Sequence, residues 1–228
     1  MLEQFDYMYN NSWSLDSVFD KTSEEFIAFS SKKGMPVKIF QIPDLIDYVP
    51  IVKEYYKQIR NANTLYVIPC DSFDSNEPLG YILRGVTEKE YICAFYKPDK
   101  GPSFQPSFGW YDFGNFTYNK PIIITEGVKD ALFIKQYYPY TIASLSCKLS
   151  ESFCRFIASL TTNVLIAFDA DTAGENAFKS AAKKFGAVGV NVKRFAPQGG
   201  CKDFGEYFKK DLDNSMKFAL NMLLSTTK

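Results

Sequence analysis

Residues 163–174 read Asn-Val-Leu-Ile-Ala-Phe-Asp-Ala-Asp-Thr-Ala-Gly, an apolar run that leads directly into two aspartates and a glycine turn. The apolar run predicts a buried strand. If the strand geometry persists past Phe168, Asp169 and Asp171 share a face, because strand residues alternate sides. Like charges about 4 Å apart repel by about 4 kcal/mol at an effective dielectric constant of roughly 20. We therefore expect a compensating cation, and hard carboxylate oxygens favour Mg²⁺ or Mn²⁺.

The chain around this segment alternates strands with helices, which is typical of a parallel sheet wound by βα units. The periodicity predicts strands at 122–125, 141–145, 164–168 and 190–195, and helices at 128–137, 150–160 and 173–185. The predicted fold class is therefore α/β, with a Rossmann-like parallel sheet.

An antiparallel sheet is predicted earlier in the chain, from β-rich runs separated by polar turns, at 65–68, 80–86 and 91–95. The residues before about 62 have helical capping signals and are expected to form helices. The chain thus divides into a smaller α+β subdomain, the parallel α/β domain and a terminal helix, with expected bounds 1–118, 119–210 and 211–228.

Composition excludes several classes of chemistry. The chain has no histidine, so imidazole-based triads and histidine-ligated metals are excluded, and carboxylates and lysines must carry any reaction. None of the five cysteines forms a C-x-x-C pair, which argues against a zinc knuckle. Lysine plus arginine equals aspartate plus glutamate at 26 each, so net charge does not indicate nucleic acid. No apolar stretch approaches the roughly 18 residues of a membrane span, and we expect a cytoplasmic protein.

Acidic residues follow three of the predicted strands. Glu126 follows the first, Asp169 and Asp171 follow the third, and the cluster 202–206 follows the last. Each has a local explanation as well, such as Asp203 capping a helix with Glu206 as its capping-box partner. Ligands of parallel βα folds bind outside the carboxyl ends of the strands, so together these acids predict a metal site.

Three motifs in this region resemble those of the Toprim domain, which primases, topoisomerases and some nucleases share. They are E-G-x-x-D at 126–130, D-x-D-x-A-G at 169–174 and K-D-x-x-E at 202–206, and they resemble primases most. The resemblance implies roles for the charged residues of these motifs. Glu126, Asp169 and Asp171 would be catalytic, these three and Asp203 would hold Mg²⁺ or Mn²⁺, Asp130 and Glu206 would support them, and Lys202 would bind nucleotide or DNA.

Residues 80–111 more weakly resemble the RNA-polymerase-like subdomain that precedes Toprim in primases. This implies that Arg84 and Lys97 bind nucleotide or template. Four aromatic residues could stack bases or could instead belong to the core, namely Tyr96, Phe104, Phe108 and Trp110. The last motif departs from the family, because Phe204 and Gly205 stand where primases have Pro or Ala and then Asp or Asn.

The resemblance implies a DNA primase core that makes short RNA primers from ribonucleoside triphosphates on single-stranded DNA. Two alternatives remain open, a metal-dependent nuclease on the same fold and a replisome adaptor that works by binding. The chain lacks a zinc-ribbon template reader and a G-x-x-x-x-G-K-[ST] helicase motif, so we expect a replicative helicase or template-reading subunit as partner. The single-module layout hints at a phage-like origin, with action in the host cytoplasm.

Overall fold

The computed structural model describes residues 38–41, 64–70, 80–85, 91–95 and 105–209. The chain forms two compact units, residues 1–98 and 99–228. Both the expected boundary near Asn119 and this division separate an antiparallel from a parallel sheet. The division falls earlier in the chain because Trp110 and Phe113 pack in the core of the second unit.

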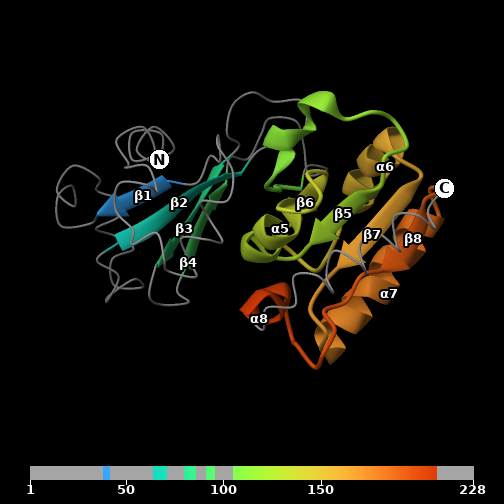
Figure 1. The fold of residues 1–228 in the computed structure, drawn as a ribbon. Coiled ribbons are helices and arrows are strands. Elements are labelled where there is room, and N and C mark those ends of the chain that lie inside the picture. The colour runs from blue at the N-terminus through green and yellow to red at the C-terminus, as the bar shows by residue number, and fades with distance from the viewer. Residues whose placement is uncertain (1–37, 42–63, 71–79, 86–90, 96–104, 210–228) are drawn as a thin grey trace. The chain divides into compact units, whose positions relative to one another are not determined.

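The first unit contains an antiparallel sheet with the strand order β1-β2-β3-β4 (Figure 1). Its strands are β1 Lys38–Gln41, β2 Thr64–Cys70, β3 Gly80–Gly85 and β4 Tyr91–Phe95. The three predicted strands are confirmed. The expectation of helix throughout the region before 62 is wrong at Lys38–Gln41, because this segment pairs with β2 instead.

The second unit contains a parallel sheet with the strand order β6-β5-β7-β8. Its strands are β5 Ile122–Thr125, β6 Thr141–Ala143, β7 Asn163–Ala167 and β8 Asn191–Arg194. Its helices are α5 Val128–Lys135, α6 Glu151–Leu160, α7 Thr172–Gly186 and α8 Phe204–Lys209. The α/β fold and every element predicted between 122 and 195 are confirmed, with ends that differ by one or two residues.

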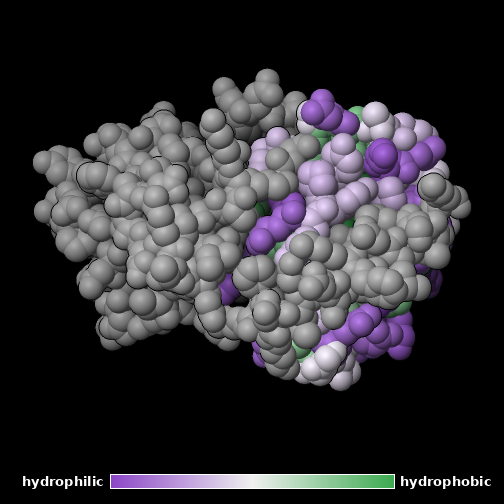
Figure 2. Space-filling view, viewed as in Figure 1, coloured by the Kyte–Doolittle hydropathy of each residue, from purple (hydrophilic) through white to green (hydrophobic). Residues whose placement is uncertain are grey.

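Each face of this sheet carries its own apolar core, because successive side chains of a strand point to opposite faces. On one face Ile124 and Ile166 pack with residues of α6 and α7. On the other, Ile123 and Leu165 pack with residues of α5 and α8. The sheet is therefore the middle of three layers (Figure 1). The described residues on the face seen in Figure 2 are mostly hydrophilic, consistent with an apolar core enclosed between the layers.

A short 3₁₀ helix, η2 Trp110–Asn115, contributes aromatic side chains to the core on the α6 and α7 side of the sheet. Just before it, Phe108 forms two main-chain hydrogen bonds of 2.9 Å with Ala143 and so extends the β6 edge. Phe108 is 0% exposed and Trp110 5%, which makes both of them core residues rather than platforms for bases. Tyr96, Phe104 and the helix expected at 211–228 lie outside the described residues. No helix in the described part of the chain is both long and apolar enough to cross a membrane.

Candidate active site

The first two acidic motifs meet because β5 and β7 are neighbours with matched ends. Thr125 pairs in register with Ala167, so Glu126 and Asp169 leave the sheet at the same edge. Glu126 is partly buried, and this burial is the main reason why its pKa is raised. The negative charges of Asp169 and Asp171 raise the pKa of Glu126 further. The three carboxylates therefore lie near enough for their charges to act on one another.

Asp171 reaches this position through a helix cap rather than through strand alternation. Strand β7 ends at Ala167, and Asp171 is the N-cap of α7, where its Oδ1 accepts a 2.8 Å hydrogen bond from the main-chain N–H of Gly174. This hydrogen bond is the largest reason why the pKa of Asp171 is lowered. A Cβ at Gly174 would overlap the main-chain oxygen of Asp169. The glycine of the motif is therefore required for the close approach of helix and loop.

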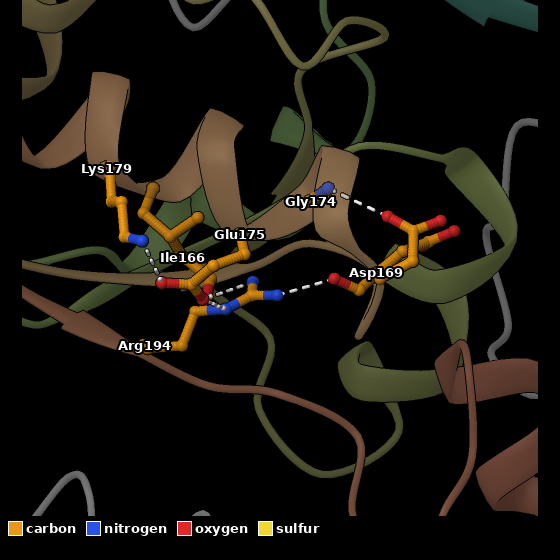
Figure 3. Close-up of polar contacts among 7 residues, drawn as sticks. Ile166, Asp169, Gly174, Glu175, Lys179 and Arg194 are labelled. Atoms are coloured by element: carbon orange, nitrogen blue, oxygen red, sulfur yellow. Dashed lines mark hydrogen bonds and ion pairs between the residues drawn. The ribbon is translucent and has the colours of Figure 1, made fainter.

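The main chain of Asp169 is held by Arg194, at the end of β8. The Nη2 of Arg194 donates a 2.6 Å hydrogen bond to the main-chain oxygen of Asp169, and its Nε lies 3.9 Å from the Oε2 of Glu175 (Figure 3). Burial and the charge of Asp203 are the largest causes of the raised pKa of the Asp169 carboxylate. Sequence reasoning missed Arg194. A basic residue at the end of the strand next to the D-x-D strand is the signal that could have found it.

The third motif forms a tight turn before α8. The main-chain N–H of Glu206 donates to Asp203 Oδ1 at 2.7 Å, and the main-chain N–H of Lys202 donates to Glu206 Oε2 at 2.8 Å. The turn is tied to the D-x-D loop by the main-chain hydrogen bond from Ala170 to the oxygen of Lys202, at 2.7 Å, and by Lys202 Nζ, 3.6 Å from Asp171 Oδ2. Asp203 therefore has the local capping role that its spacing allows, whereas the Glu206 side chain accepts from Lys202 rather than from Asp203, as a capping box would require. Asp203 also lies near enough to Asp169 to raise its pKa.

Asp130 connects the first motif to the third. Its Oδ1 accepts a 3.1 Å hydrogen bond from the main-chain N–H of Phe204, at the start of α8. Burial, followed by the charges of Asp203 and Asp169, raises the pKa of Asp130 to about 7. The departure at Gly205 has a packing reason, because a Cβ there would stand 3.1 Å from Asp203 Oδ1 and 3.4 Å from the ring of Phe133.

The acidic residues have the chemistry of a divalent-metal site. The charges of neighbouring acids help to raise the pKa values of Glu126, Asp130 and Asp169. A bound cation would relieve this repulsion between the acids. Carboxylate oxygens are the hard donors that Mg²⁺ and Mn²⁺ prefer. In the described part of the chain, no group of three or more acidic or cysteine side chains is arranged to hold a metal ion. The predicted ligand set therefore stays a prediction.

The two basic residues predicted before this domain belong to the first unit. Arg84 lies on β3, opposite Tyr66 of β2 and Tyr91 of β4, and its side chain is partly buried. Lys97 lies outside the described residues. Their predicted contacts with nucleotide or template stay predictions.

Comparisons with known proteins agree with this architecture. Residues 123–208 match the family model described as Toprim-like. No curated protein sequence matches the chain.

Solved structures of primases share the fold. The Aquifex aeolicus primase (zinc-binding and RNA polymerase domains) has a TM-score of 0.68 at 19% identity, covering 98% of this chain and 60% of that one. The E. coli primase catalytic core has a TM-score of 0.64 at 14% identity, covering 94% and 78%. The primase fragment of the bacteriophage T7 primase-helicase protein has a TM-score of 0.57 at 15% identity, covering 92% and 80%. This chain thus spans less than two thirds of the Aquifex structure. Residues 123–208 thus match a Toprim-like family model, and the fold of the chain is similar to that of primase catalytic cores.

Proposed function

We propose that this chain is the catalytic core of a DNA primase, which synthesises short RNA primers from ribonucleoside triphosphates on single-stranded DNA. The observation that carries the proposal is the convergence of Glu126, Asp169 and Asp171 at one edge of a parallel sheet, where their charges act on one another. Without histidine, phosphoryl transfer at such a site depends on positioning and on charge stabilisation. The fold shared with solved primase cores supports this reading over other uses of an acidic cluster.

The D-x-D carboxylates, together with Glu126 and Asp203, would hold Mg²⁺ or Mn²⁺. Divalent ions there would polarise the triphosphate and stabilise the charge that develops on departing pyrophosphate. Asp171 is suited to ligation because its lowered pKa keeps it ionised. Glu126 would serve as a further ligand or as the general base that accepts the proton of the primer 3′-hydroxyl. Its raised pKa favours the base role, since a base works best near the ambient pH.

Lys202 would contact a phosphate of the incoming nucleotide. Its side chain is 59% exposed although Nζ lies 3.6 Å from Asp171 Oδ2, so the ammonium group remains accessible at the rim of the acidic cluster. Arg84 and Lys97 of the first unit would add contacts to the nucleotide or the template. Asp130 and Glu206 would act indirectly, by holding the turn that leads into α8. Asp130 accepts from the N–H of Phe204 and Glu206 accepts from the N–H of Lys202, the two residues on either side of Asp203.

The test is primer synthesis on single-stranded DNA with all four ribonucleotides and either Mg²⁺ or Mn²⁺. Short labelled products are expected, and Asp169→Asn should abolish them. Glu151→Gln is the matched control, because Glu151 is an exposed acid at the start of α6 whose charge pairs with Arg155. It should leave the yield of primers unchanged.

The same preparation decides between the proposal and its alternatives. A nuclease would give no primers with either ion and would cleave plasmid DNA until Asp169 is replaced, since the same carboxylates can direct water at a phosphodiester. A binding adaptor would do neither. The solved T7 protein is a primase-helicase, which supports a helicase as the partner to test first when primer yield is low. Such an enzyme would act in the cytoplasm, where its nucleotide substrates are.

A further inference from the structure

From the end of β8, Arg194 contacts three neighbouring segments of the chain, one of which is the D-x-D loop of the acidic site (Figure 3). Its Nη2 donates to the main-chain oxygen of Asp169 at 2.6 Å, and its Nη1 lies 3.5 Å from the main-chain oxygen of Ile166 in β7. Its Nε lies 3.9 Å from the carboxylate of Glu175, in the first turn of α7. The guanidinium therefore joins the end of the strand, the D-x-D loop and the helix that follows.

The guanidinium is itself held in place. Its carbon lies 5.6 Å from the ring centre of Phe178, and its side chain is only 16% exposed. The side chain starts from a fixed point, because Arg194 pairs in register with Ile166. A planar guanidinium with several fixed donors loses less freedom on binding two acceptors than a flexible ammonium does.

The main-chain oxygen of Asp169 is a critical point of the loop. It faces Gly174, where no Cβ could fit, and Arg194 donates to it. The next residue, Ala170, donates its N–H to the main-chain oxygen of Lys202 at 2.7 Å. The loop peptides are therefore fixed from both sides, and the orientation of the two carboxylates follows from the orientation of these peptides.

Arg194 and Lys202 differ in whether they occupy carboxylate oxygens that a cation could bind. Lys202 lies 3.6 Å from a carboxylate oxygen of Asp171, so it competes with any cation for that oxygen. Arg194 binds the main-chain oxygen of Asp169. Its hydrogen bond therefore fixes the loop and leaves the carboxylate oxygens of Asp169 to other partners.

We propose that Arg194 is a positioning residue that holds the D-x-D loop in the conformation that binds a divalent cation. The proposal rests on the metal site of the proposed function. Partners of metal ligands that act from the next layer change metal affinity by about 10-fold to 100-fold when they are replaced.

The first experiment measures hydrogen exchange of the amides in 168–175 in the metal-free protein. Arg194→Met keeps the aliphatic stem and removes the donors, and exchange should become about tenfold faster or more, as expected for the loss of a hydrogen bond from a charged group. Lys179→Met is the matched control, because Lys179 pairs with the same Glu175 at 3.4 Å (Figure 3). Exchange in Lys179→Met should match the wild type. Equal exchange in the two variants would overturn the proposal.

The second experiment measures Mn²⁺ binding by electron paramagnetic resonance, without DNA or nucleotide. The dissociation constant should rise about 10-fold to 100-fold in Arg194→Met, by a smaller factor in Arg194→Lys and less than about twofold in Lys179→Met. If the wild type binds Mn²⁺ and both Arg194 variants bind it within twofold, the positioning role is wrong and the metal site stands. If the wild type shows no saturable Mn²⁺ binding, both the positioning role of Arg194 and the proposed metal site are wrong. Should Arg194→Met not fold, Arg194→Lys decides, and weakening of more than threefold supports the proposal.

Discussion

Replacing Asp130 by asparagine should stabilise the metal-free protein at alkaline pH. The carboxyl group has a raised pKa of about 7 against 3.8 for an ordinary aspartate, mainly because it is buried and secondly because Asp203 and Asp169 are close. Between these two values the folded chain holds a proton that the unfolded chain has released. The free energy of unfolding therefore falls as the pH rises through this window.

The size of the effect follows from the shift. A difference of 7 − 3.8, at about 1.4 kcal/mol for each pH unit, gives at most about 4 kcal/mol lost above pH 7. The side-chain amide in Asp130→Asn would keep an oxygen to accept the hydrogen bond from Phe204 and would carry no charge. Its buried NH₂ group has a desolvation cost of about 1–3 kcal/mol, so we expect a net gain on the order of 2 kcal/mol at pH 8. At pH 5, where Asp130 is already protonated in the folded chain, the gain should vanish.

Urea unfolding with EDTA at pH 5 and pH 8 measures this difference. Trp110 is 5% exposed in the core of the second unit, so its fluorescence in a Trp13→Phe background reports on that unit alone. Asp130→Ala is the control, because it removes the charge but also the oxygen that accepts from Phe204, and it should be less stable than Asp130→Asn at both pH values. An Asp130→Asn protein that is no more stable than the wild type at pH 8, or equally stabilised at pH 5, would refute the reasoning.

Two other substitutions test the same site. Gly174→Ala should destabilise the protein and stop primer synthesis, because its Cβ would overlap the oxygen of Asp169, whereas Gly186→Ala, with nothing within 4 Å, should change the melting temperature little. Lys202→Gln should move the acid limb of the pH profile for primer synthesis to higher pH, because the charge of Lys202 lowers the pKa values of Glu126 and Asp169. An unchanged acid limb in Lys202→Gln would show that these two carboxylates do not control the rate.

Local signals in the sequence were sufficient for the parallel sheet and its helices. The run Ile122–Thr125 is wholly buried, as four consecutive apolar or β-branched residues predict. Ser150 was expected at the start of α6, and its hydroxyl accepts from the N–H of Phe153 at 3.1 Å, as a helix cap does. These elements depend on neighbouring residues, and the sequence displays those directly.

Features that depend on distant partners were predicted less well. Lys38–Gln41 was expected to be helical, and it is a strand because β2 supplies its hydrogen bonds. Arg194 carries no motif, and its contact with Asp169 spans 25 residues. Tertiary contacts decide such features, and periodicity does not record them.

The two edges of the parallel sheet are protected in different ways. The β6 edge is covered at Ala143 by main-chain hydrogen bonds with Phe108, whereas β8, among the described strands, pairs only with β7. An open edge invites further strands to add, and this leads to aggregation. Strand β8 is only four residues long and ends in Lys193 and Arg194, the short and cationic pattern that discourages such pairing. The strand that supplies the guanidinium for the D-x-D loop is thus also the short edge strand that would keep this domain from polymerising through its sheet.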